Sequence, residues 1–286
     1  MTESRASRSR ARSGVAPAIT TVILVATTLA IAISAAAFAY NMLELQTQTA
    51  EYENGKSTMV SLAEMIEGLA FARGSAAYTT FYMSTGGLEL TRGTASITVN
   101  VAGSQILGPA PVNVIKLRGG SFVASPDYQI LRGDPSKEAN ESLIMHSGTS
   151  AIEPLGWVYA MRQAGAWVID DFGRVRVVFS GTNNYSINGI SWKLYNVVEL
   201  IYINTTFGSF SGTNTIDVTT KVTRANTSYY KLDGVTSVTV IVTRGAASES
   251  YSVPSPSTFK GVPVAGTIVM LSVVDVQVSL AQGGGT

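Results

Sequence analysis

The sequence predicts an α+β protein, with one long N-terminal α-helix followed by an all-β, β-sandwich-like C-terminal domain. Two observations support this fold class. No acidic or basic residue occurs from Ser13 to Leu43, and after Gly74 short β-branched and aromatic runs alternate with Gly, Ser, Asn and Asp turns. We therefore divide the chain into residues 1–14, a helix over residues 15–73, and a β-rich region over residues 74–286.

The uncharged run is the most informative part of the predicted helix. An apolar stretch of about 18 residues or more is long enough to span a bilayer. Basic residues precede it and an acidic residue, Glu44, follows it. Basic residues mark the cytoplasmic side of a membrane span, so we expect the chain from Glu44 onward to lie outside the cell. The four basic residues are Arg5, Arg8, Arg10 and Arg12.

The predicted helix continues beyond the apolar run as a one-sided stripe. Its apolar positions are Met59, Leu62, Ile66 and Leu69, with Glu64 and Glu67 off the stripe. Arg73-Gly74 provides a stop signal, and Asn54-Gly55 marks a place where the helix could kink or divide. An unbroken helix to residue 72 would be ~85 Å long at ~1.5 Å per residue. Its apolar part therefore requires lipid or other copies of the chain around it.

The β-rich region contains nine predicted strands and one predicted helical turn, at residues 138–146. In the last strand Val274, Val276, Val278 and Leu280 alternate with polar residues, which predicts one buried and one wet face. Many short strands with turn-rich connections are typical of a sandwich or a related all-β domain. The predicted strands cover residues 95–102, 112–117, 157–160, 166–170, 174–179, 197–204, 215–222, 235–243 and 268–280.

Three interpretations of the N-terminus compete. A cleaved secretory signal peptide normally has a shorter apolar core with its small-residue site at the end, as in Ser34–Ala39. An uncleaved signal anchor would hold an external domain at the membrane. In the third interpretation the small-residue site, Ser13-Gly14, comes before the apolar run, so that cleavage there would leave the run in the mature protein.

That order resembles the class III signal peptide of archaeal type IV pilins and archaellins, over residues 10 to about 45. The resemblance implies cleavage between Gly14 and Val15 by a prepilin peptidase, export through a pilus assembly machinery, and a membrane-inserted precursor. The mature chain would polymerise with itself into an extracellular filament. Bacterial type IV pilins carry a glutamate near the mature N-terminus, and its absence between Val15 and Leu43 points to the archaeal branch.

The polymerisation surface implied by this resemblance is the helix itself. Ala-Pro-Ala-Ile after Gly14 is more similar to adhesive pilins than to archaellins, and small residues allow close helix packing. An archaellin and a monomeric, membrane-anchored binding module remain the alternatives. The implied polymerisation residues are Val15, Pro17, Ile19, Val22, Ile23, Leu24, Val25, Leu29, Ile31, Ile33, Phe38, Tyr40 and Leu43.

Composition excludes several classes of function. The chain has no cysteine, so it has neither disulfides nor a thiolate metal site. Loss of residues 1–14 removes four Arg and one Glu, so 20 basic and 19 acidic residues become 16 and 18. Such a balance does not indicate nucleic-acid binding, which requires a concentrated cationic face.

No motif predicts an enzyme, a cofactor or a metal. Glu53–Thr58 resembles the end of a phosphate-binding loop but lacks the first glycine and a preceding strand. Asp171-Phe172-Gly173 is interpreted as a turn between two strands, because no other kinase motif accompanies it. His146 is the single histidine and is interpreted as a surface residue. Asp170-Asp171 could contribute to a Ca²⁺ site, although a turn or ion-pair role is favoured.

Two groups of residues concern the surface of the β-rich region. Trp157, Trp167 and Trp192 are interpreted as core and sheet residues, with a carbohydrate or surface-contact patch as the alternative. Sequons predict N-glycosylation sites at Asn140, Asn184, Asn204 and Asn226. Archaeal pilins are commonly glycosylated, so the family resemblance favours modification of at least one site.

Overall fold

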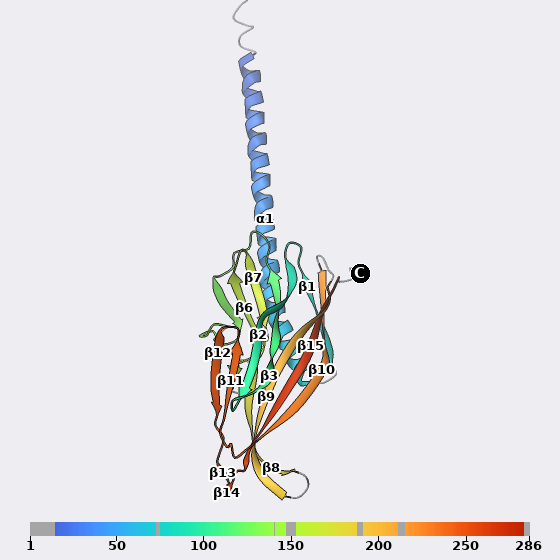
Figure 1. Ribbon diagram of the computed structural model, residues 1–286. Coiled ribbons are helices and arrows are strands. Elements are labelled where there is room, and N and C mark those ends of the chain that lie inside the picture. Colours follow the sequence, from blue (N-terminus) through green and yellow to red (C-terminus); the bar gives the residue numbers. More distant parts are fainter. Residues whose placement is uncertain are drawn as a thin grey trace, which may run out of the picture. The chain divides into compact units, whose positions relative to one another are not determined.

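The computed structural model describes residues 15–72, 75–139, 141–146, 153–187, 191–210 and 215–282. The chain forms two compact units, Met1–Thr47 and Gln48–Thr286. Helix α1 (Val15–Phe71) belongs to both, and a mostly β region follows it (Figure 1). The α+β class is confirmed. The helix is unbroken at Asn54 and Gly55, so it does not divide there.

The second unit begins with the last part of α1 and continues as a set of strands. Several strands are much longer than the runs that predicted them, because each extends into neighbouring polar residues. The strands are β1 (Ala76–Tyr82), β2 (Gly87–Val101), β3 (Ser104–Arg118), β4 (Tyr128–Arg132), β5 (Ile144–Met145), β6 (Trp157–Arg162), β7 (Ala166–Asp171), β8 (Val175–Ile187), β9 (Ser191–Phe210), β10 (Thr215–Asp233), β11 (Val238–Arg244), β12 (Ala247–Val253), β13 (Thr258–Phe259), β14 (Val262–Pro263) and β15 (Gly266–Gln282).

The larger strands form two main sheets. One has the order β1-β10-β15-β9-β8-β5, and the other β12-β11-β2-β3-β7-β6-β4. In the first sheet β15 lies between β10 and β9, antiparallel to β10 and parallel to β9. The alternation predicted for this strand is confirmed: Val276, Val278 and Leu280 are buried, and Gln277 and Ser279 are half-buried.

Both sheets contribute to the core. One cluster of buried side chains joins the packed part of α1 to residues of both sheets, including Leu117 of β3 and Val276 of β15. A second cluster combines Val99 and Val240 from one sheet with Val198 from the other. The hydrophobic faces of the strands are therefore covered by apolar side chains of the same unit.

All nine predicted strands are present. The structure differs from the sequence prediction in one helical turn that does not form and in several additional strands. The predicted helical turn at residues 138–146 is wrong, because its described residues form turns and the short strand β5. Val175 donates its backbone N–H to the carbonyl of Leu143, which fixes this segment against β8 in an extended form. Strands β1, β4 and β12 were not predicted, because their sequences mix polar and apolar residues without a long hydrophobic run, and the two-residue strands β5, β13 and β14 are too short to give a pattern.

Candidate assembly segment and the charges that hold the helix

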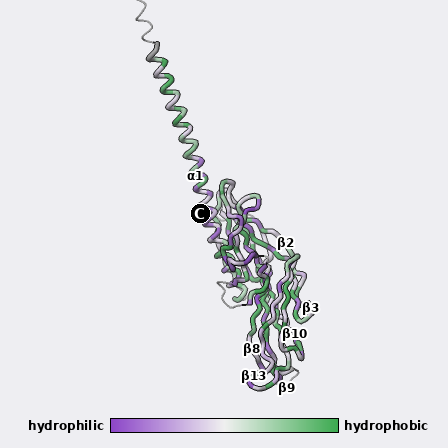
Figure 2. Tube along the Cα trace, turned by 90° about the vertical axis from the view of Figure 1, so that its left-hand side faces the viewer, coloured by the Kyte–Doolittle hydropathy of each residue, from purple (hydrophilic) through white to green (hydrophobic). Residues whose placement is uncertain are grey.

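The described part of the N-terminal unit is the solvent-exposed first part of helix α1. Every residue from Ala18 to Leu43 is exposed, and we call this stretch the apolar segment. The large hydrophobic side chains predicted for polymerisation are between 54% and 70% exposed from Ile19 to Leu43. Figure 2 shows the hydrophobic colour concentrated along this part of α1. The helix is long and apolar enough to cross a membrane.

The hydroxyl groups of Thr27, Thr28 and Ser34 in the apolar segment bond to backbone carbonyls of the helix that carries them. Thr27 Oγ1 donates to the carbonyl of Ile23 at 2.8 Å, and Ser34 Oγ donates to that of Ala30 at 2.8 Å. Side chains that satisfy their donors within the helix present little polar surface outward. The segment can therefore be surrounded by hydrocarbon, either from lipid or from other helices, without leaving these donors unpaired.

The predicted cleavage site has only partial structural description. Gly14 lies outside the described residues, and Val15 is the first residue of α1. The backbone of Pro17 is helical, while the side chains of residues 15–17 are outside the description. Proline is tolerated in the first helical turn because the amide there has no acceptor within the helix.

The second half of α1 is a core element. We call Gln48–Phe71 the packed segment. The predicted stripe is confirmed, since Met59, Leu62 and Ile66 are fully buried and Leu69 nearly so. Gly55 lies against Leu117 so closely that a Cβ would come within 2.6 Å of the leucine side chain. The glycine that suggested a break is thus a close-packing position.

Glu67 was expected to lie off the stripe, and that expectation is wrong. Its side chain is buried and accepts hydrogen bonds from Arg132 of β4 and Arg176 of β8, both at 2.8 Å. The backbone N–H of Leu155 donates to the same carboxylate at 3.2 Å. A buried charge is tolerated only when it is paired and hydrogen-bonded. Glu67 therefore ties the packed segment to both sheets.

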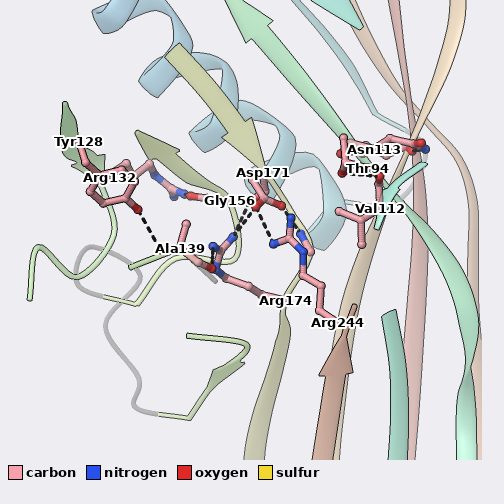
Figure 3. Close-up of polar contacts among 12 residues, drawn as sticks. Thr94, Val112, Asn113, Tyr128, Arg132, Ala139, Gly156, Asp171, Arg174 and Arg244 are labelled. Atoms are coloured by element: carbon pink, nitrogen blue, oxygen red, sulfur yellow. Dashed lines mark hydrogen bonds and ion pairs between the residues drawn. The ribbon is translucent and has the colours of Figure 1, made fainter. Parts of the chain in front are cut away.

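A second buried charge cluster surrounds Asp171, at the end of β7 (Figure 3). Arg244 donates to Asp171 Oδ2 at 2.6 Å, and Gly173 N donates to Oδ1 at 2.8 Å. Arg174 donates to the Asp171 carbonyl at 2.7 Å and lies over the Trp157 ring. Burial alone would raise the pKa of Asp171, but Arg174 and Arg244 outweigh it and hold that pKa below its ordinary value.

The neighbouring carboxyl group, Asp170, has the opposite environment. It is fully buried, and neither of its oxygens has a hydrogen-bond partner in the described part of the chain. Burial raises the pKa of Asp170 well above its ordinary value, with Arg132 opposing the shift. The described residues contain no group of three His, Asp or Glu that could hold a metal. With Asp171 already neutralised by arginines, this pair does not fit a Ca²⁺ site.

The remaining sequence candidates are scattered over the second unit. Asp171 is the last residue of β7, and Phe172 and Gly173 lie in the short connection to β8. His146 is exposed and stacks on Tyr251, with ring centroids 4.2 Å apart. Trp157 is buried, Trp167 is half-buried and Trp192 is 73% exposed, so only the first two fit the core and sheet interpretation.

The four sequons differ in accessibility. Asn184 on β8 and Asn226 on β10 are exposed. Asn204 is half-buried, and its Nδ2, the atom that a glycan would modify, donates to Asp275 at 2.7 Å. Asn140 lies outside the described residues. Among the predicted N-glycosylation sites that the structure describes, Asn184 and Asn226 are therefore the most accessible to a glycan.

Sequence alone could not have located the two charge clusters, because their members come from distant strands. The sequence carries only a partial signal for these clusters. Glu67 and the pair Asp170-Asp171 are acidic residues next to apolar runs, but nothing in the sequence identifies their arginine partners. Comparison with protein-family models, curated proteins and solved structures finds no match to this chain. The functional argument therefore rests on the residues and their geometry.

Proposed function

We propose that this chain is a structural subunit of an archaeal type IV pilus-like filament that serves surface adhesion. It would polymerise through the apolar segment of α1. The observation that carries the proposal is that every residue of Ala18–Leu43, a stretch without charge, is exposed. Burial of apolar surface gains roughly 25 cal/mol per Å², so this segment has a strong drive to leave water.

The proposed assembly uses two environments in turn. In the precursor, lipid would surround the apolar segment, and residues 1–14 would remain on the cytoplasmic side. After cleavage at Gly14, the segment would leave the membrane and pack against the same segment of neighbouring subunits. Head-to-tail contacts related by a screw axis give an open filament. The β-rich region would form the outer layer, and we infer a sandwich-like arrangement for it from the core that its two sheets share.

N-terminal sequencing and microscopy of sheared material from archaeal cells test this proposal. We expect filaments whose subunits begin at Val15. Gly14→Ile should block cleavage and leave precursor in the membrane without filaments, whereas Gly14→Ala, which keeps a small residue, should retain both cleavage and filaments. A mature protein that begins at Met1 or Tyr40 would contradict the proposal.

Two alternatives predict different results in the same cells. An archaellin would form filaments whose loss abolishes swimming, while loss of an adhesive pilus should reduce attachment and leave swimming intact. A membrane-anchored binding module would remain monomeric in detergent and form no fibres. The exposed apolar segment is compatible with anchoring, so the absence of fibres in cells that cleave the chain at Gly14 would favour the module.

A further inference from the structure

One end of the β-rich region carries large apolar side chains in water. Trp192, near the start of β9, is 73% exposed. On the β13–β14 hairpin, Val262 is 52% and Phe259 is 37% exposed. Isolated apolar residues on a surface need no explanation, but a group of them at one place often marks an interaction site.

These side chains belong to neighbouring segments. Strands β15 and β9 run parallel, with Gly266 opposite Tyr195. Ala265 N donates to the carbonyl of Leu194 at 2.8 Å, so the alignment continues beyond the strand. The segment that leads from the β13–β14 hairpin into β15 therefore runs beside the start of β9. Figures 1 and 2 both show β13 and β8 at the same end of the β-rich region. We call Trp192, Phe259 and Val262, with Lys193 and Lys260, the tip patch.

The hairpin in the tip patch is a projecting turn. Lys260 and Gly261 have φ angles of 51° and 79°. Two successive positive φ values are typical of a tight type I′ hairpin turn, which fixes the directions of its flanking residues. All residues from 258 to 263 are exposed. The hairpin of the patch therefore lies fully on the surface, and the patch shares no residue with the cavity of about 560 Å³ that Glu51, Asn54 and Tyr82 help to line.

The charge of the tip patch is positive. Over residues 183–187, 191–195 and 254–266 the charged residues are Lys193 and Lys260, and none is acidic. Lys260 Nζ lies 5.5 Å from the centre of the Phe259 ring. The nearby acid, Asp233, pairs with Lys231 at 2.7 Å. Hydrogen bonds from Lys231 and then Tyr195 lower the pKa of Asp233, and the charge of Lys193 adds to this only weakly. This acid is therefore already neutralised by Lys231.

We infer that the tip patch is a contact for lipid bilayers with anionic phosphate headgroups. Aromatic and aliphatic side chains flanked by lysines, on an exposed turn, match the requirements of the membrane interface. The rings enter the headgroup region while lysine stems extend to the phosphates. A sugar-binding site would instead be expected in a concave pocket with several converging polar groups. The inference goes beyond filament formation and names one surface that the β-rich region contacts.

The test must separate the tip patch from the apolar segment of α1, which itself enters lipid. The full-length chain is therefore held in nanodiscs of phosphatidylcholine, so that α1 is already in a bilayer. Separate acceptor vesicles contain phosphatidylcholine alone or phosphatidylcholine with phosphatidylglycerol in equal parts. Co-flotation of the nanodiscs with the acceptor vesicles reports binding by the rest of the chain, and empty nanodiscs provide the background.

We expect co-flotation with the phosphatidylglycerol vesicles and much less with the neutral ones. Substitution of Trp192, Phe259 and Val262 together by Ser should weaken binding at least tenfold, because it removes most of the inserted apolar surface. Lys193→Gln and Lys260→Gln should each weaken it about fivefold. Tyr82→Ser is the matched control, since Tyr82 is equally exposed but lies on β1, and it should leave binding unchanged.

A second measurement locates the contact. Brominated lipid in the acceptor vesicles should quench the fluorescence of the wild-type chain, whereas Trp192→Phe should remove this quenching and keep the co-flotation. Failure of the wild-type chain to bind any vesicle, or equal binding by the triple Ser variant with unchanged circular dichroism, would overturn the inference. Binding to acidic polysaccharide beads without binding to vesicles would also overturn it. The vesicle-binding experiment does not require filaments. A negative result would therefore overturn the membrane-contact inference without bearing on the proposed filament assembly.

Discussion

The two halves of α1 have the same backbone conformation and opposite surroundings. The apolar segment, Ala18–Leu43, has no charge and is wholly exposed, while the packed segment, Gln48–Phe71, has its hydrophobic stripe buried in the core and carries a buried ion pair. Helical propensity alone does not distinguish them. The difference lies in where the apolar side chains point. They cover all faces of the helix in the first half and only one face in the second half. A helix that is apolar all round requires partners beyond its own chain.

The largest expected effect in the packed segment concerns its buried charge. Glu67→Ala should lower the free energy of unfolding of the second unit by about 3–5 kcal/mol, because Arg132 and Arg176 would lose their buried partner. Glu64→Ala is the control, since the Glu64 side chain is 63% exposed and lies 4.0 Å from Arg132. Its effect should stay within about 0.5 kcal/mol. Urea denaturation followed by circular dichroism measures both, and equal effects would contradict the assignment of Glu67.

A pair of leucine substitutions compares the two halves directly. Leu62→Ala should destabilise the second unit by about 2–5 kcal/mol, because it leaves a cavity in the core. Leu29→Ala should leave that stability unchanged, since the Leu29 side chain is 59% exposed, but it should weaken assembly. Thermal unfolding in detergent measures the first effect and filament yield the second. A large loss of stability from Leu29→Ala would show that the apolar segment belongs to the folded core.

Sensitivity to pH should arise in the second unit, because the apolar segment contains no carboxylate, histidine, lysine or arginine. The lowered pKa of Asp171 stabilises the folded state above the ordinary carboxyl pKa, and this stabilisation is lost as pH falls through the lowered value. Asp171→Asn should therefore cost roughly 3 kcal/mol at neutral pH and progressively less in acid.

Asp170 should behave in the opposite way. Its raised pKa favours the folded state at low pH, and the contribution is lost as pH rises from the ordinary carboxyl value toward the raised one. Asp170→Asn should thus become relatively more stable than wild type as pH rises, by about 1.4 kcal/mol for each pH unit within that range. Denaturant midpoints between pH 3 and pH 8 measure both variants. Parallel curves for the two aspartates would contradict the environments described here.

The smallest expected effect concerns the surface of the β-rich region. Asn184→Gln and Asn226→Gln should each change stability by less than about 0.5 kcal/mol, because both side chains are exposed. Each should remove one glycan mass from the protein purified from an archaeal host. Asn204→Ala should instead cost about 1 kcal/mol through its lost hydrogen bond to Asp275 and change no glycan mass. Peptide mass spectrometry with unfolding curves separates these outcomes.

Local patterns predicted much of this fold. The stripe from Met59 to Leu69 and the alternation from Val274 to Leu280 each identify an element and its buried face. The ion pairs of Glu67 and Asp171 could not be predicted, since Arg132, Arg176 and Arg244 reach them only after distant strands pair. The hairpin residues of the tip patch could not be linked to Trp192 for the same reason, because β9 and the segment before β15 come together through a parallel register that no local pattern specifies.

The position of β15 also has a consequence for biosynthesis. Among the described strands β15 comes last along the chain, yet it occupies the interior of its sheet and is paired along most of its length with both β10 and β9. Until residue 282 has left the ribosome, those two strands lack their shared neighbour and cannot complete the sheet. Contacts between segments far apart in the chain also form slowly. We therefore expect the first sheet to stay incomplete during synthesis until β15 has been made and can pair with both of its neighbours.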